Sequence, residues 1–268
     1  MELEYGLVEN ALDSLREAMN YYNEGDEEDN ANQYKFSILL SAHCVELLLK
    51  EILRRNHPAL LFENIDSVKD LQDDDNQTVG YKNAIQRVKK LCGVDLKQYE
   101  TYIDELGRVR NQIQHYKCSI NGEYHKQLMA KTFSAIEFIF RDILGLKFED
   151  YENIIEPADI DFLHEDIAAN KARKKDIVKD FEKSENRFRI EYVDGKYLEV
   201  CCPHCGTESL ALESNGKIKC KFCGEEFDNY SELHKADRNC ITQYGILEEE
   251  DIYFIQEFLN ALNVKMIR

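Results

Sequence analysis

The chain has 268 residues, of which 43% are apolar, so it can bury a hydrophobic core and is long enough for one large domain and a small one. A formal net charge of −18 argues against a protein that coats nucleic acid through a broad basic surface, so any contact with nucleic acid has to be local. The chain shows neither a signal-peptide pattern nor an apolar run of about 18 residues or more, and we therefore expect a cytoplasmic protein without a membrane partner.

Apolar residues at helical spacing predict a series of helices in the first part of the chain. The expected helices cover residues 3–24, residues 32–55, a segment that ends near Cys92, residues 95–117 and residues 124–144. The second is apolar nearly all round, so we expect it to be central and buried. Its polar exceptions should share one narrow stripe: His43, Glu46, Lys50 and Arg54. Short connections favour antiparallel neighbours, so the expected fold is an up-and-down helical bundle.

The second half of the chain has a different composition. A Lys-rich helix is expected from about Ile160 to Lys183, and near Arg187 the apolar period changes from helical to two, which predicts a hairpin turning at Asp194 and Gly195. A last helix is expected over residues 248–262. The sequence thus predicts a mainly α protein with a helical bundle (1–148), a helical connector (149–186), a small β-rich domain (187–232) and a C-terminal helical segment (233–268).

Four cysteines of the β-rich part have the spacing of a metal site. Two residues separate Cys202 from Cys205 and Cys220 from Cys223, and a glycine follows each pair. Such knuckles let four thiolates surround one Zn²⁺ in a closed tetrahedral site, so we expect a structural zinc rather than a hydrolytic one. The rival ligands have poorer spacing: Cys201, His204, His234 and Cys240.

The stretch around these cysteines resembles a zinc ribbon. Ribbons often contact nucleic acid or protein, but this one is locally acidic, through Glu225, Glu226, Asp228 and Glu232. A module that docks another protein or supports a dimer is therefore at least as well favoured as a reader of nucleic acid.

Arg108, Arg110, Asn111 and His115 lie on the fourth expected helix and are the best clue to function. A guanidinium holds phosphate, and an imidazole titrates near neutrality, so together they supply what a metal-free ribonuclease needs. Asn111 and His115 share a face, whereas Arg110 is roughly 140° from His115 around the helix. The simpler interpretation is an ordinary polar face. Other basic groups, at residues 87–90 and 171–175, are best explained as solvated helix faces.

These residues lie in a sequence that resembles the HEPN superfamily of helical-bundle proteins, over its first 145 residues or so. The family motif is an arginine, a polar residue, three further residues and a histidine, matched by Arg110, Asn111 and His115; Arg108 also qualifies in the wider form of the motif. The segment from Ala42 to Lys50 looks like the family's second helix. Some members use a glutamate and a lysine four residues later as site residues, which correspond to Glu46 and Lys50.

The resemblance implies a homodimer that cleaves RNA without a metal, with the motifs of two protomers forming one composite site. Arg110 would hold the scissile phosphate, His115 would move a proton, and Asn111 would orient either group. The substrate would be tRNA, mRNA or invading transcripts, in a defence or toxin context with an antitoxin or activator protein as further partner. Members silenced by nucleotide transfer carry a tyrosine two residues after the histidine. Here Lys117 stands in that position, which argues against this form of control.

Two alternatives stay open. In the first, the bundle and the ribbon form a non-catalytic binding or regulatory module, which the acidic charge suits. In the second, weaker one, the chain is a DNA-binding regulator, although it has no helix-turn-helix signature. Substitution of His115 separates a nuclease from a binding module, because only the nuclease needs the imidazole.

Overall fold

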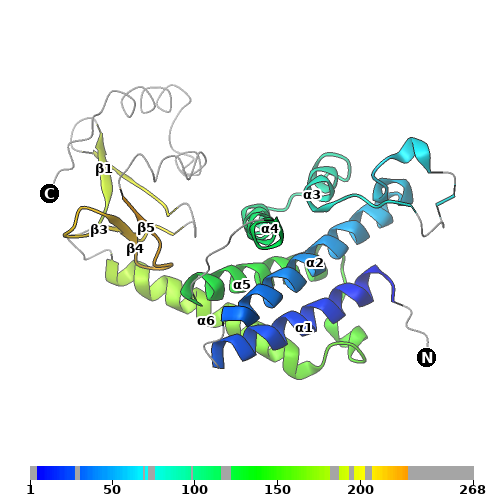
Figure 1. Cartoon of the computed structure of the whole chain (residues 1–268), viewed down its shortest axis with the longest axis horizontal. Helices are drawn as coiled ribbons and strands as arrows, with labels where there is room; N and C mark the ends of the chain where they lie inside the picture. Colours follow the sequence, from blue (N-terminus) through cyan, green and yellow to red (C-terminus); the bar gives the residue numbers. More distant parts are fainter. Residues whose placement is uncertain are drawn as a thin grey trace. The chain divides into compact units, whose positions relative to one another are not determined.

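The computed structural model describes residues 5–27, 31–68, 70–71, 76–97, 99–115, 122–181, 187–192, 196–202 and 207–228. The chain divides into two compact units, residues 1–170 and residues 171–268 (Figure 1). The predicted last helix at 248–262 lies outside the described residues, as do Cys205, His204, His234 and Cys240. Among the residues described, no helix combines the length and the hydropathy needed to cross a membrane.

The first unit is helical, as predicted. Its elements are α1 (Leu7–Glu27), α2 (Ala31–Asn56), the short helices η1 (Pro58–Leu61) and η2 (Ile65–Ser67), α3 (Tyr81–Lys90), α4 (Tyr99–His115), α5 (Gly122–Glu137), the π-helix η3 (Phe138–Ile143) and η4 (Phe148–Tyr151). The following helix α6 (Pro157–Phe181) begins in this unit and ends in the second.

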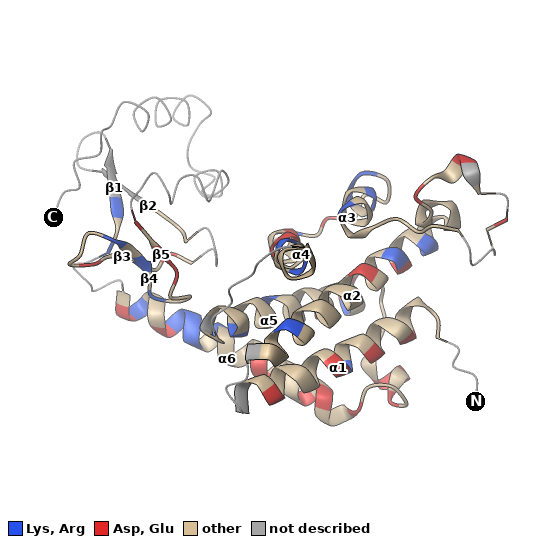
Figure 2. Ribbon diagram, in the orientation of Figure 1, with Lys and Arg blue, Asp and Glu red and all other residues tan. Residues whose placement is uncertain are grey.

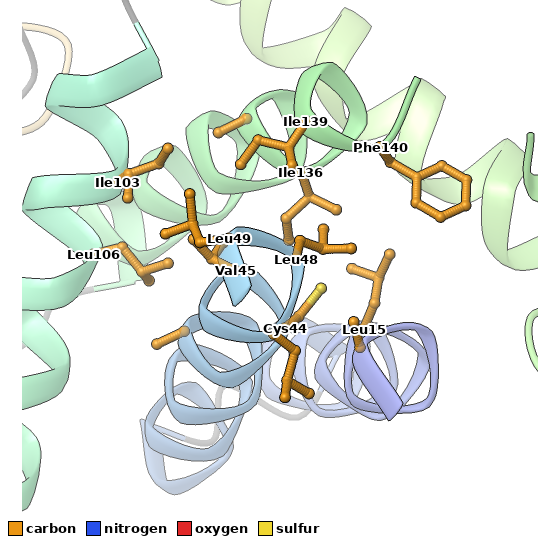
Figure 3. Close-up of a cluster of buried hydrophobic side chains, with 14 of the residues drawn as sticks. Leu15, Cys44, Val45, Leu48, Leu49, Ile103, Leu106, Ile136, Ile139 and Phe140 are labelled. Carbon is orange, nitrogen blue, oxygen red and sulfur yellow. The ribbon is translucent and has the colours of Figure 1, made fainter. Parts of the chain in front are cut away.

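Helix α2 is the centre of the bundle. It contacts α1, α3, α4 and α5, and its apolar residues from Ala42 to Leu53 are buried, as its sequence predicts, whereas Phe36 nearer its start is exposed. Around it lie side chains from α1, α4, α5 and η3 (Figure 3). Each large apolar side chain that is fully buried there contributes about 1.5–3 kcal/mol to folding. The labelled members are Leu15, Cys44, Val45, Leu48, Leu49, Ile103, Leu106, Ile136, Ile139 and Phe140.

Helix α4 does not run along α2. In Figure 1, α1, α2 and α5 extend across the view, whereas α3 and α4 are seen almost along their axes. The short connections predicted an up-and-down bundle in which all helices run along one direction. That prediction is wrong for α3 and α4, which cross the other helices. Helix α4 contacts the central helix through apolar side chains, which include Ile103 and Leu106, and through Arg110, which lies 3.9 Å from Glu46 of α2.

The end of α5 widens into the π-helix η3. The Leu144 N–H donates to the carbonyl of Ile139, five residues earlier, at 2.9 Å. Phe138, Ile139 and Phe140 are all buried although they are consecutive. The ring of Phe138 stacks on Tyr99 of α4 and that of Phe140 on Phe148 of η4, with centroids 4.5 and 4.4 Å apart. The apolar period of the sequence predicts a helix here but not its wider turn.

The described residues of the second unit form two small antiparallel sheets. Strands β1 (Arg189–Tyr192) and β2 (Lys196–Glu199) form the predicted hairpin, with Arg189 opposite Glu199. Strands β3 (Leu210–Leu212), β4 (Ile218–Cys220) and β5 (Glu226–Phe227) form a three-stranded sheet in that order. This sheet has its own apolar core, to which the sheet, its flanking turns and the end of α6 contribute: Val200, Leu210, Ile218, Phe222 and Phe227, with Ile177 and Phe188 packed against them.

Candidate functional site

Three charged side chains meet where α4 crosses α2. Glu46 Oε1 lies 2.8 Å from Lys50 Nζ, one turn later on α2, and Glu46 Oε2 lies 3.9 Å from Arg110 Nη2 on α4. The side chains of Glu46, Lys50 and Arg110 are 16%, 11% and 29% exposed, so all three are partly withdrawn from water. We call them the Glu46–Lys50–Arg110 cluster. It joins two of the residues suggested by the second-helix segment to one arginine of the motif.

The cluster carries two positive charges against one negative charge. Lys50 Nζ also donates to Thr78 Oγ1 at 3.0 Å, and Arg110 Nη1 donates to Asn111 Oδ1 at 3.1 Å. A partly buried guanidinium beside an ammonium, with one carboxylate to hold both, is an arrangement that can accept an anion such as a phosphate. Arg110 therefore bonds its neighbour in the motif, Asn111, and also contacts α2 through Glu46.

His43 borders the cluster from α2. Its Nδ1 lies 2.9 Å from Ser14 Oγ of α1, which also bonds the carbonyl of Asn10 at 2.9 Å. Partial burial lowers the pKa of His43 below its ordinary value; Glu46 acts in the opposite direction, while Lys50 and Arg110 add to the lowering. These charges reach His43 from both α2 and α4, so the imidazole shares the electrostatic field of the cluster.

His115 stands apart from the cluster within one chain. It is the last residue of α4 and is exposed, as is Asn111 one turn earlier. Five residues of helix separate Arg110 from His115 by about 7.5 Å along the axis and roughly 140° around it. Since Arg110 turns toward α2, the motif's arginine and histidine occupy different sides of α4.

Arg108 belongs to another group of side chains. Its Nη2 donates to Tyr124 Oη at 3.3 Å, and Tyr124 Oη donates to Glu105 Oε1 at 3.0 Å. Glu105 also accepts from Lys131 at 2.9 Å, and burial raises the pKa of Tyr124. Arg108 therefore faces α5, whereas Arg110 faces α2, and the two arginines that the motif leaves open have different surroundings.

Arg54 lies outside the cluster as well. Its guanidinium bonds both oxygens of Glu51, at 2.7 and 2.8 Å, and its side chain is 52% exposed. Of the four residues expected on the polar stripe of α2, His43, Glu46 and Lys50 therefore belong to or border the cluster, and Arg54 does not.

The basic stretches at residues 87–90 and 171–175 each contain an arginine with a structural role. Arg87 donates to the carbonyls of Leu60 and Phe62, and Arg173 lies over the ring of Phe222 at 5.6 Å. The remaining Lys and Arg residues of α6 are visible in Figure 2.

Three buried cysteines form a candidate metal centre in the second unit. The sulfurs of Cys202, Cys220 and Cys223 all lie within 4.8 Å of one another, and those of Cys202 and Cys223 are 3.6 Å apart. A disulfide would bring two sulfurs to about 2.05 Å. Tetrahedral zinc, with bonds of about 2.3 Å, separates its sulfur ligands by roughly 3.8 Å. The observed spacing therefore fits thiolates arranged around a metal ion.

The surroundings of Cys220 also fit a metal thiolate. Its sulfur accepts from the Cys223 N–H at 3.4 Å and lies 3.2 Å from Ser209 Oγ and 3.7 Å from Thr207 Oγ1. Gly224 follows with a φ of +74°, the left-handed backbone that a glycine adopts without strain. Donors directed at sulfur stabilise its negative charge and orient the ligand. Cys205 lies outside the described residues, and Cys201, although buried, is not part of the described cluster.

Comparison with protein-family models, with curated proteins and with solved structures gave no match for this chain. The features of the chain that point to a function are the motif on α4, its contact with α2 and the cysteine cluster.

Sequence reasoning missed several members of these groups. Ser14 comes from α1, far from either motif, and carries no pattern of its own. Tyr124, Glu105 and Lys131 around Arg108 are ordinary helix residues in the sequence. One signal could have separated the arginines: Arg110 lies four residues after Leu106 and seven after Ile103, at the edge of the apolar face, whereas Arg108 does not.

Proposed function

We propose that this chain is a metal-independent endoribonuclease of the HEPN type, acting on tRNA or mRNA as a homodimer. The observation that carries the proposal is the contact of Arg110 with Glu46 beside Lys50, because it joins the family-like segments of α2 and α4 in one charged cluster. That cluster has the excess positive charge and partial burial that favour binding of a phosphodiester.

In the proposed reaction, Arg110 binds the scissile phosphate and stabilises the charge that develops on it. The ribose 2′-oxygen attacks phosphorus after losing its proton to a base, and the bond from phosphorus to the 5′-oxygen breaks as that oxygen receives a proton. His115 serves in one of these proton transfers, and Asn111 orients the phosphate or the imidazole. The products carry 2′,3′-cyclic phosphate and 5′-hydroxyl ends, and DNA is not cleaved because it lacks the nucleophile.

The geometry of α4 supports the proposal of a dimer. Arg110 and His115 point to different sides of this helix, so one chain does not direct both at the same phosphate. A two-fold axis near the end of α4 would bring the partner's His115 to the Arg110 side. The exposed side chains of Asn111, Gln112, Gln114 and His115 leave this end of α4 accessible to a second copy.

The second unit is proposed to be a zinc ribbon in which Cys202, Cys205, Cys220 and Cys223 hold one Zn²⁺. With four protein ligands the metal has a structural role, and the ribbon docks the RNA or supports the dimer. A set of thiolates kept reduced suits the cytoplasm. The biological context that we propose is defence or a toxin system, in which an antitoxin or activator protein restrains or triggers cleavage.

The test is cleavage of a mixed pool of tRNA and mRNA in excess EDTA by the wild-type protein, His115→Ala and Arg110→Ala. We expect fragments with cyclic-phosphate ends from the wild type and at least about 100-fold slower cleavage by either variant. A wild type that binds RNA or protein without cleaving, and whose binding His115→Ala leaves unchanged, would instead support the non-catalytic binding module.

A further inference from the structure

We propose that His43 is a second proton-transfer group of the ribonuclease site, supplied by the same chain as Arg110, so that the site uses two histidines, one from each protomer. This inference rests on the proposed ribonuclease function and adds a residue outside the arginine–histidine motif of α4. The assignment is based on three features of His43: its place beside the Glu46–Lys50–Arg110 cluster, its attachment to Ser14 and its exposure to solvent.

The hydrogen bonds around Ser14 define which nitrogen of His43 carries its proton. The Ser14 hydroxyl has one hydrogen, and the Asn10 carbonyl at 2.9 Å can only accept it. Ser14 Oγ then offers a lone pair to His43 Nδ1, also at 2.9 Å, so Nδ1 donates. In the neutral ring, Nε2 is left unprotonated. Since the residue is exposed, this nitrogen can accept a proton from a bound substrate.

The charges facing His43 suit a base. On its own helix, Glu46 stabilises the imidazolium and Lys50 destabilises it; from α4, Arg110 also destabilises it; and from α1, the neutral Ser14 holds the ring. Together with partial burial, these groups lower the pKa of His43, so the ring is neutral at pH 7 and Nε2 is available.

The two histidines then divide the proton transfers. His43 Nε2 accepts the proton of the 2′-hydroxyl while the 2′-oxygen forms its bond to phosphorus. Arg110 of the same chain holds the phosphate. The bond from phosphorus to the 5′-oxygen breaks, and the protonated His115 of the partner gives its proton to that oxygen. Hydrolysis is not involved, so the number of protons is conserved: one leaves the 2′-oxygen and one reaches the 5′-oxygen.

The first test compares the pH dependence of RNA cleavage by the wild type, His43→Ala and Ser14→Ala. We expect His43→Ala to lose at least about 100-fold and to lose the acidic limb of the profile. Ser14→Ala should keep part of the activity and shift the acidic limb, because the ring is no longer held in one tautomer. His164→Ala is the matched control, since His164 is also a partly exposed histidine but pairs with Glu137 on α5, and it should behave as the wild type.

The second test uses heterodimers of two inactive variants, co-expressed with different tags and purified through both. If one site contains His43 and Arg110 from one chain and His115 from the other, His43→Ala paired with His115→Ala restores one intact site and about half of the wild-type rate. Arg110→Ala paired with His115→Ala also restores one site. His43→Ala paired with Arg110→Ala restores none, because one site of the heterodimer lacks His43 and the other lacks Arg110.

The outcomes separate this inference from the proposed function. Wild-type cleavage together with a His43→Ala variant that keeps the normal rate and pH profile overturns the role of His43 and leaves the ribonuclease intact. If the heterodimer of His43→Ala and Arg110→Ala is active, His43 and Arg110 of one site come from different chains, which overturns this part of the proposal. A wild type that does not cleave RNA overturns both. The amide spectrum of each variant checks its fold, and His43→Gln provides a second variant where His43→Ala unfolds.

Discussion

Arg110 of α4 lies 3.9 Å from Glu46 of α2, whereas Arg108, two residues earlier, contacts Tyr124 of α5 at 3.3 Å. The two arginines that fit the motif therefore belong to separate groups of side chains. Arg110 shares a carboxylate with Lys50 at a partly buried position, and Arg108 joins a network that connects α4 to α5. This difference makes the two residues a matched pair for experiment.

Replacing Arg110 by alanine should affect RNA cleavage far more than replacing Arg108. We expect Arg110→Ala to reduce RNA cleavage by about 100-fold or more, because it removes the group that we propose to hold the phosphate, while changing the thermal midpoint little. Arg108→Ala should keep most of the activity. The measurement is the initial rate of cleavage under single-turnover conditions beside a thermal melt. Equal loss of activity in both variants would contradict the assignment of Arg110.

Removal of the Glu46 charge should weaken the cluster. Glu46→Gln leaves Lys50 and Arg110 without their shared carboxylate, and we expect a loss of about 1 kcal/mol in the free energy of unfolding, together with slower cleavage. Glu100→Gln is the control, because Glu100 pairs with Lys89 in a more exposed ion pair, and it should cost less. Urea titrations of both variants measure the difference; a larger loss for Glu100→Gln would contradict this expectation.

Loss of a cysteine ligand should affect the second unit alone. We expect the wild type to contain about one zinc ion per chain, and Cys220→Ser to contain almost none, because a closed four-thiolate site fails without one ligand. The helical circular dichroism of the first unit should persist. Cys201→Ser is the control for the rival ligand and should retain zinc. Metal analysis by mass spectrometry gives the content, and zinc loss in Cys201→Ser with retention in Cys220→Ser would reverse the assignment.

Buried His125 should make the bundle sensitive to acid. Its ring is fully buried, its Nε2 is 2.6 Å from Ser37 Oγ, and burial lowers its pKa from 6.5 to about 3. Above pH 6.5 both the folded and the unfolded states hold it neutral. As the pH falls from 6.5 toward 3, only the unfolded state binds the proton, so stability decreases by up to about 1.4 kcal/mol per pH unit.

The measurement for His125 is urea unfolding of the wild type and His125→Gln at pH 7 and pH 5. The variant lacks this titration, so its stability should change less between the two pH values, although other groups titrate in both proteins. Identical pH dependence in the two proteins would show that His125 is protonated in the folded state as well.

The helices could be predicted because their apolar residues recur at helical spacing, but their ends depend on local backbone chemistry. The expected start near Asp95 moves to Tyr99, because the Asp95 side chain accepts from the Lys97 N–H and Lys97 adopts a left-handed φ of +52°. Neither the side-chain hydrogen bond nor the left-handed residue shows in the spacing of apolar residues. The crossing of α4 over α2 also leaves no trace in either helix alone, since it depends on which faces pack together.

The candidate site was predictable in its residues and less so in its geometry. Spacing predicted four cysteines as metal ligands, and three of them, Cys202, Cys220 and Cys223, lie together; the motif predicted Arg110, Asn111 and His115 as site residues. The contact of Arg110 with Glu46 depends on the packing of two helices that are distant in sequence, and the attachment of His43 to Ser14 depends on a third. A single sequence contains the members of such groups but not the distances between them.

The π-helical turn at Phe138–Ile143 makes the length of this segment matter more than its surface residues. A π-helical turn holds one residue more than an α-helical turn, so deleting the exposed Asp142 would let the turn return to α-helical spacing while the residues that follow keep their orientation. An insertion would instead rotate the following residues by about 100° and would displace both Leu144, whose carbonyl accepts from Arg55 at 2.7 Å, and Phe148, which stacks on Phe140. Substitution or deletion of Asp142 should therefore be tolerated in evolution, whereas insertions between Phe140 and Phe148 should be selected against.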